Sequence, residues 1–213
     1  MAKRLPKKIL LDFNMEKQKE YAWCWAAVGT SSALYYKPSS GWTQCKIVED
    51  TLKPDSVNCC SDPSSMVCDR PFALLNDSHK GALVTAHIQS SYVDGEFTTE
   101  ELMTDLSKGQ LVAYRLEIGL KDTIRLSSTQ SISKFFHFVV IAGYKLHGKE
   151  VHKKNLMVYV YDPFSLDEGY SVMSYHTFLN NYKCHGGAVP TPNSSKSDKT
   201  TYARVTHSFH TSV

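Results

Sequence analysis

The sequence predicts an α+β protein, with helices in its first half and an antiparallel sheet in its second. Helix-forming segments with recognisable starts and ends lie before residue 110, and runs of β-branched and aromatic residues lie after it. The chain has 213 residues, of which 42% are hydrophobic and 21% charged, enough to bury one sizeable core. No repeat or linker interrupts it, so we expect one domain over residues 14–213. A helical lobe over about 14–109 and a β lobe over about 110–213 should follow a basic, solvated tail at 1–13.

Three segments of the first half favour helices. Residues 24–36 are dense in alanine and aromatics and end at Lys37-Pro38, where the proline disfavours helical geometry in the residue before it. A shorter helix is expected over 44–52. A third is predicted after Thr98, which offers an N-cap, with two glutamates in its first turn and Gly109 at its end.

Three strands are predicted in the second half, because three segments rich in β-branched and aromatic residues are bounded by Gly or Pro. They lie at 111–118, 135–144 and 156–162. Residues 202–205 and 208–213 should add edge strands, and 190–199 should form a surface loop. The polar stretch 119–134 is longer than a simple connection, and is either a substrate-contacting loop or a surface excursion without a role.

The apolar patterning and the charge exclude two classes of protein. The longest apolar stretch, 135–144, is interrupted by His137 and falls short of the roughly 20 residues of a membrane span. Residues 9–11 are too short an apolar core for a secretory signal, so we expect any export signal to have been removed or to be of another kind. The net charge is +3 with both signs scattered along the chain, so no nucleic-acid partner is expected.

Cys24 stands where an apolar helix is predicted to begin. Backbone N–H groups and the helix dipole favour negative charge there, which raises the fraction of reactive thiolate. Gln18, upstream of the turn, can offer side-chain N–H donors toward an oxyanion that forms beside the sulfur. The alternative is a buried, inert core cysteine.

A nucleophilic cysteine needs a base and a group that orients the base, and the predicted sheet supplies both. His137 lies at the start of an apolar strand, and Asp162-Pro163 ends the next strand. A hairpin centred near Lys149 and Glu150 would place His137 opposite Asp162, so that the carboxylate holds the imidazole while its other nitrogen faces Cys24. Taken singly, His137 also fits a hydrogen-bonded core histidine, and Asp162 a turn residue before proline.

These motifs resemble those of the bacterial papain-like cysteine peptidases related to double-glycine-leader peptidases, a group that includes a plant-pathogen type III effector protease. The similarity extends from about residue 14 to the end of the chain. The segments that carry it are Gln18 and Cys24-Trp25-Ala26-Ala27, 136–144, 160–163, Gln44-Cys45, Cys59-Cys60, Cys68, 173–175, 178–182 and 206–211.

The resemblance implies a papain-like fold, in which a helical lobe carrying the nucleophile packs on an antiparallel β-sheet lobe. It implies Cys24 as nucleophile, His137 as general base and acid, Asp162 as the residue that orients it, and Gln18 in the oxyanion hole. The chain departs from the family in having Phe136 before the histidine, where glycine is expected.

Five further cysteines remain, an odd number, so at least one of them is unpaired in a monomer. They are Cys45, Cys59, Cys60, Cys68 and Cys184. A secreted enzyme would carry two bridges, within the 45–68 region, whereas a cytosolic one would keep its thiols reduced. The spacing does not match a structural zinc site, although His79 or His87 could complete one, and we expect no metal.

We therefore expect a papain-like thiol protease that hydrolyses a peptide or isopeptide bond through an acyl-enzyme, without metal or organic cofactor. Its partner would be a protein or peptide substrate, and it would act as a bacterial effector or toxin, secreted or delivered outside the producing cell. One alternative keeps the Cys-His-Asp site but makes the protein an amidase or acyltransferase. Another is a catalytically silent binding domain in which Phe136 occludes His137. The substrate and the oligomeric state cannot be deduced from the sequence.

Overall fold

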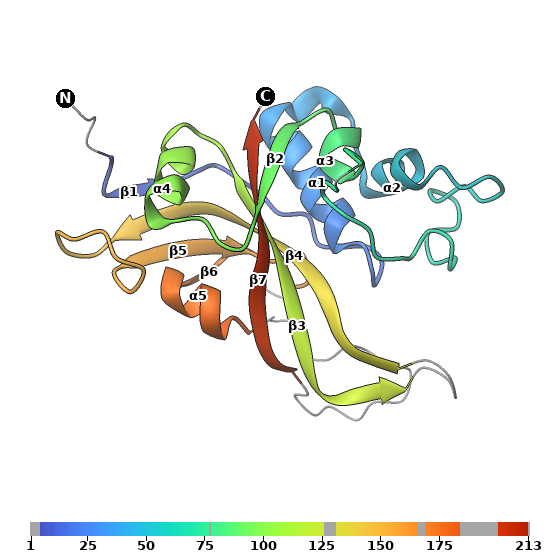
Figure 1. Ribbon diagram of the computed structural model, residues 1–213. Helices are drawn as coiled ribbons and strands as arrows, with labels where there is room; N and C mark the ends of the chain where they lie inside the picture. The colour runs from blue at the N-terminus through green and yellow to red at the C-terminus, as the bar shows by residue number, and fades with distance from the viewer. Residues whose placement is uncertain (1–4, 77, 126–130, 166–168, 184–199, 213) are drawn as a thin grey trace.

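A seven-stranded antiparallel sheet forms the centre of the molecule (Figure 1). The computed structural model describes residues 5–76, 78–125, 131–165, 169–183 and 200–212. The strand order is β2-β7-β3-β4-β5-β6, and β1 pairs with β4. The strands are β1 (Lys8–Leu10), β2 (Gln89–Asp94), β3 (Val112–Arg125), β4 (Ser131–Leu146), β5 (Leu156–Tyr161), β6 (Ser171–Ser174) and β7 (Thr200–Ser212).

Helices cover both faces of the sheet. The helices are α1 (Cys24–Tyr36), α2 (Gln44–Leu52), α3 (Ala82–Thr85), α4 (Thr99–Ser107) and α5 (Tyr175–Asn181), with a 3-10 turn at Pro38–Ser40. Side chains from α1, α2 and α3 form one buried cluster with Phe138 and Val140 of β4, whereas α4 and α5 pack in a second cluster with Val139 and Ile141. Because successive side chains of a strand point to opposite faces, the two clusters lie on opposite sides of the sheet.

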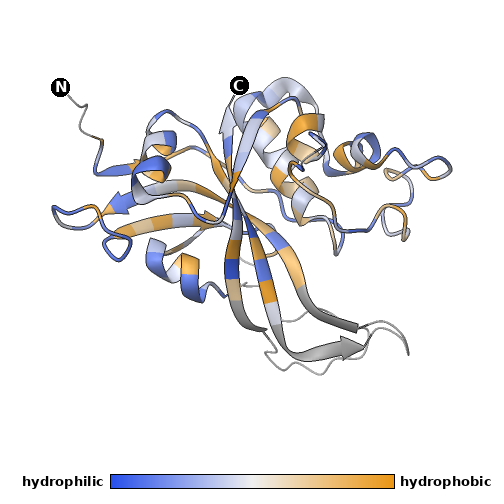
Figure 2. Ribbon diagram, viewed as in Figure 1, coloured by the Kyte–Doolittle hydropathy of each residue, from blue (hydrophilic) through white to orange (hydrophobic). Residues whose placement is uncertain are grey.

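The three predicted helices are confirmed. Both α1 and α2 have the predicted bounds, and α4 is held by a capping box in which the Thr98 side chain accepts from the Glu101 backbone while Glu101 accepts from Thr98. Gly109 follows α4 with φ of +78°, a left-handed conformation that glycine adopts readily. The predicted strands correspond to β3, β4 and β5, and β5 is hydrophobic along most of its length (Figure 2).

Two predictions about the chain's organisation were wrong. The basic tail ends earlier than residue 13, because Lys8–Leu10 pair with β4 and Phe13 is buried. The two predicted edge strands are one strand, β7, which lies between β2 and β3. The polar break between them is a bulge at Thr206, since Arg115 pairs with His207 and Leu116 with Val205.

The division into lobes is also less sharp than the sequence suggests. β2 comes from the predicted helical lobe but joins the sheet, and α5 comes from the predicted β lobe. Most of the stretch 119–134 continues β3 and β4 as a long hairpin, with residues 126–130 outside the described part. The predicted loop at 190–199 also lies outside the described residues. Among the helices that the structure describes, none is long and apolar enough to cross a membrane.

Candidate active site

Cys24 is the first residue of α1 and is 7% exposed. The helix has Trp23 at its N-cap, without a side-chain cap, and has no acidic residue in its first turn. The first backbone N–H groups of the helix therefore have no side-chain acceptor from the N-cap position. Among the described cysteines, Cys24 is the one outside a disulfide. The helix dipole also places partial positive charge at this end of α1.

His137 lies on β4 just beyond the end of its pairing with β5. The last paired residues are Val140 of β4 and Tyr161 of β5, and β5 then leads directly into Asp162-Pro163. On the other side, β3 continues to pair with β4, with Leu116 opposite His137. Within the described residues, His137 therefore lies where no strand pairs with the β5 side of β4, and it is itself 4% exposed.

The His137 ring contacts the Asp162 carboxylate, with 2.7 Å between Nε2 and Oδ1. The contact agrees with the prediction, but the predicted register of the two strands was wrong. Leu146 pairs with Leu156, so the hairpin is centred near residue 151 and not at Lys149-Glu150. In this register Asp162 falls beyond the paired region and reaches diagonally back to His137. Diagonal neighbours on one face are within reach of long side chains.

Three donors surround the Asp162 carboxylate. Oδ1 accepts from the backbone N–H of Phe164 at 2.8 Å as well as from His137, and Oδ2 accepts from the Tyr182 hydroxyl at 2.6 Å. Burial by itself would raise the pKa of Asp162, but the positive charge and hydrogen bond of His137, with the bonds from Tyr182 and Phe164, outweigh it. The pKa of Asp162 is lowered to about 2. The carboxylate is therefore ionised at any pH near neutrality.

This charge state fixes the tautomer of the neutral imidazole. An ionised carboxylate only accepts hydrogen bonds, so the proton of the His137–Asp162 bond belongs to Nε2. In neutral His137 the basic lone pair is then on Nδ1. The pair presents one defined nitrogen for proton transfer, which is the arrangement that general base catalysis requires.

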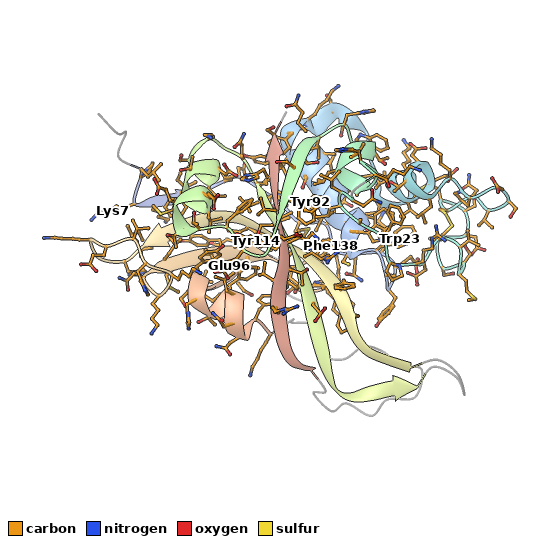
Figure 3. All side chains as sticks on the ribbon, in the orientation of Figure 1. Lys7, Trp23, Tyr92, Glu96, Tyr114 and Phe138 are labelled. Carbon is orange, nitrogen blue, oxygen red and sulfur yellow. A yellow bond between two sulfur atoms is a disulfide. The ribbon has the colours of Figure 1, made fainter. Side chains whose placement is uncertain are left out.

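The segment before α1 contacts the chain just after Asp162. The backbone N–H of Gln18 donates to the carbonyl of Pro163, the residue after Asp162, at 2.9 Å. Cys24 belongs to the same buried cluster as Phe138 and Tyr161, which are the chain neighbours of His137 and Asp162. Helix α1 also packs against β4. Figure 3 shows Phe138 near the crossing of the central strands and Trp23 in the adjoining helical region.

The Gln18 side chain contacts the turn that leads into α1. Its amide nitrogen donates to the carbonyls of Glu20 at 3.0 Å and Tyr21 at 2.6 Å, which uses both N–H groups. Its oxygen is buried and is reached by no donor among the described residues. The side chain therefore shapes the approach to Cys24 in the resting structure, and its role toward an oxyanion stays a prediction.

Phe136 does not lie on the face of the sheet that His137 occupies. The two residues are adjacent on β4, so their side chains point to opposite faces. The Phe136 ring is 43% exposed and lies under the Arg115 guanidinium, 4.5 Å from the ring centre. The aromatic ring that meets the imidazole edge-on is Phe164, at 6.4 Å between centroids. Phe136 therefore does not cover the imidazole from the face of the sheet that His137 occupies.

Sequence reasoning missed the residues that support the site from outside its motifs. Tyr182 follows α5 and contacts Asp162, and the only signal for it was its place in a segment that resembles the family. The residues around Cys24 are held by the loop between α2 and α3, which is called the disulfide-bonded loop. Its bridges are Cys45–Cys60 and Cys59–Cys68, in the region predicted for them, while Cys184 lies outside the described residues.

Known proteins share similarity with this chain. The model of the Peptidase_C39-like family matches residues 10–189. Among solved structures, xylellain, a cysteine protease from Xylella fastidiosa, is similar with a TM-score of 0.49 and 11% sequence identity, over 99% of this chain and 87% of that chain. A search of curated proteins found no match. The family match spans both the helical lobe and most of the sheet, which confirms the predicted α+β fold of a papain-like cysteine protease, and the chain belongs to the Peptidase_C39-like family.

Proposed function

We propose that the protein hydrolyses a peptide or isopeptide bond through a thiol acyl-enzyme formed on Cys24. The observation that carries the proposal is the His137–Asp162 hydrogen bond, because it makes Nδ1 the basic nitrogen of the imidazole. The uncapped start of α1 supports the same assignment, since its N–H groups favour negative charge at the sulfur and at an oxyanion beside it.

In the first half of the reaction the Cys24 thiolate attacks the carbonyl carbon of the scissile bond. A C–S bond forms, and the carbonyl electron pair moves to oxygen, where the Cys24 backbone N–H stabilises the oxyanion. Nδ1–H of the His137 imidazolium then gives its proton to the leaving amine as the C–N bond breaks. Gln18 enters the oxyanion hole if one of its N–H bonds to the turn carbonyls is exchanged for the oxyanion.

In the second half water replaces the amine. His137 takes a proton from water through Nδ1, the resulting hydroxide attacks the acyl carbon, and the C–S bond breaks to release the acid and restore the thiolate. Asp162 keeps its charge throughout and stabilises the imidazolium, which is consumed in the first half and formed again in the second.

We further propose that the protease is a secreted effector or toxin that acts outside the cytosol of the producing cell. The two disulfides support this location, because such bridges persist in oxidising environments and are rare in reducing ones.

The test of the function is a search for new protein N-termini in bacterial, plant and animal lysates exposed to the purified protein. We expect the wild type to generate a defined set and Cys24→Ala to generate none, because alanine removes the nucleophile and is well tolerated at a helix start. Cys184→Ser is the matched control and should produce the same set as the wild type. Equal sets from wild type and a folded Cys24→Ala variant would contradict the proposal.

A further inference from the structure

We propose that Tyr182 is a positioning residue of the active site, acting on His137 through Asp162. This inference rests on the proposed function, since it gives the buried carboxylate a second fixed contact during catalysis. The Tyr182 hydroxyl donates to Asp162 Oδ2 at 2.6 Å, while Oδ1 is engaged by His137. Each carboxylate oxygen therefore has its own side-chain donor, and rotation of the carboxylate would break both bonds.

The place of Tyr182 in the fold suits this role. Tyr182 is 1% exposed and comes directly after α5, where its ring packs on Phe178 at 5.5 Å between centroids. Ser174 caps the N-terminus of α5, because its side chain accepts from the Thr177 backbone N–H, and the residue after the other end is Tyr182. A short, capped helix thus delivers one hydroxyl to the far side of the catalytic carboxylate.

Loss of the hydroxyl would act on the base through its partner. Without Tyr182 the carboxylate loses one of the bonds that lower the pKa of Asp162, and Oδ2 is left buried without that donor. The carboxylate then keeps its Oδ1 contacts with His137 and Phe164 but loses the donor that fixes Oδ2, so the imidazolium proposed to stabilise the Cys24 thiolate is held less well. We expect a lower population of thiolate and imidazolium below neutral pH.

The test measures alkylation of Cys24 by iodoacetamide at pH 6 in a Cys184→Ser background, which requires no knowledge of the substrate. We expect Tyr182→Phe to slow the reaction about threefold to tenfold. The same substitution should have no further effect in an Asp162→Asn background, because the hydroxyl acts only through the carboxylate. Equal slowing in both backgrounds would indicate a merely structural role and would overturn the inference.

Tyr114→Phe is the matched control. Tyr114 is also fully buried, and its hydroxyl lies 3.1 Å from that of Tyr175, away from Asp162. Cys24 in Tyr114→Phe should be alkylated at the wild-type rate. A decrease in rate equal to that of Tyr182→Phe would also overturn the inference. If the wild type itself reacts no faster than an ordinary cysteine, the proposed function fails; if the wild type is fast and Tyr182→Phe equally fast, only this inference fails.

A different observation carries a second inference, which also rests on the proposed function. Three residues around the nucleophile donate hydrogen bonds to three consecutive residues of the disulfide-bonded loop. The bonds are Ala22 N–H to Asp69 Oδ1 at 2.7 Å, Trp23 Nε1–H to the Cys68 carbonyl at 2.9 Å, and Trp25 Nε1–H to the Arg70 carbonyl at 3.1 Å. We propose that the Cys59–Cys68 bridge holds this loop against Cys24, so that the protease is active only while the bridge is oxidised.

The two bridges differ in where they lie. Cys59 and Cys68 are both fully buried, and Cys68 itself accepts one of the three hydrogen bonds. Cys60 is exposed and Cys45 half-buried, and neither contacts the residues around Cys24 in these bonds. A dithiol such as dithiothreitol reduces either bridge by giving two electrons and two protons, and becomes a cyclic disulfide itself. Because thiolate access is needed, the Cys45–Cys60 bridge should be reduced first.

The experiment compares Cys59→Ser/Cys68→Ser with Cys45→Ser/Cys60→Ser in the Cys184→Ser background. We expect the first pair to lower the rate of Cys24 alkylation at pH 6 at least tenfold, and the second to change it less than about twofold. Full reactivity in a folded Cys59→Ser/Cys68→Ser variant, or equal losses in both pairs, would overturn the inference. If the first pair fails to fold, the wild type is titrated with dithiothreitol instead. The rate of Cys24 alkylation should then fall as the Cys59–Cys68 bridge is reduced. An alkylation rate that does not change as this bridge is reduced would overturn the inference.

Discussion

At the scale of single residues, the site depends on how charge is placed around one buried carboxylate. Asp162 is removed from water but has donors from His137, Tyr182 and Phe164, and the pKa of Asp162 is lowered to about 2. The sequence predicted the contact with His137 from a hairpin that joins the two strands, although the register of that hairpin was wrong. It could not predict Tyr182, because that contact depends on how a short helix after β6 packs on the sheet.

The lowered pKa of Asp162 predicts a pH-dependent contribution to stability. A carboxylate with a pKa near 3.9 when unfolded and about 2 when folded stabilises the fold above pH 4, by roughly 2 kcal/mol. This stability is lost as the pH falls from about 4 to about 2. We expect Asp162→Asn to be less stable than the wild type at pH 6, with the difference shrinking toward pH 2.

Guanidinium unfolding of both proteins at several pH values measures this difference. Asp55→Asn, which removes an exposed carboxylate, serves as the control, and its stability relative to the wild type should change little over the same range. A gap between Asp162→Asn and the wild type that stays constant from pH 6 to pH 2 would show that the carboxylate is not stabilised as the geometry indicates.

At the scale of elements, prediction succeeded where the signal was local. Helices α1, α2 and α4 carry their own starts and ends in the sequence, such as Thr98 and Gly109 around α4. The strand β7 was divided in two because its bulge at Thr206 places polar residues in mid-strand, and the bulge is specified by the partner strand β3. The predicted β4–β5 register was wrong because it was found by counting residues to the centre of the hairpin. The turn beyond Leu146 has hydrogen bonds of its own, and these shift the register.

The connection between the disulfide-bonded loop and α1 was beyond sequence analysis for a different reason. Pairing of the vicinal cysteines with separate partners could not be chosen from spacing, since several pairings are possible among the remaining cysteines. The loop then contacts the helix start through backbone carbonyls at Cys68 and Arg70, and carbonyl positions leave no trace in residue identity.

At the scale of the whole molecule, the candidate site lies where the helical layer meets the end of strand pairing in the sheet. The proposed nucleophile, Cys24, comes from α1, and the proposed base and its partner come from β4 and the end of β5. Such a site would exist only when both parts are packed together, and the Gln18–Pro163 bond joins the segment before α1 to the chain just after Asp162. The search for new N-termini would identify the substrate.

The most direct measurement of the central claim is the pH dependence of Cys24 alkylation by iodoacetamide in the Cys184→Ser background. If Cys24 and His137 form a thiolate–imidazolium pair, the reaction should be rapid at pH 6, and His137→Ala should need a higher pH to reach the same rate. The two groups titrate together, so the profile should show two apparent transitions that belong to the pair. A wild-type rate that rises only above about pH 8, unchanged by His137→Ala, would contradict the account.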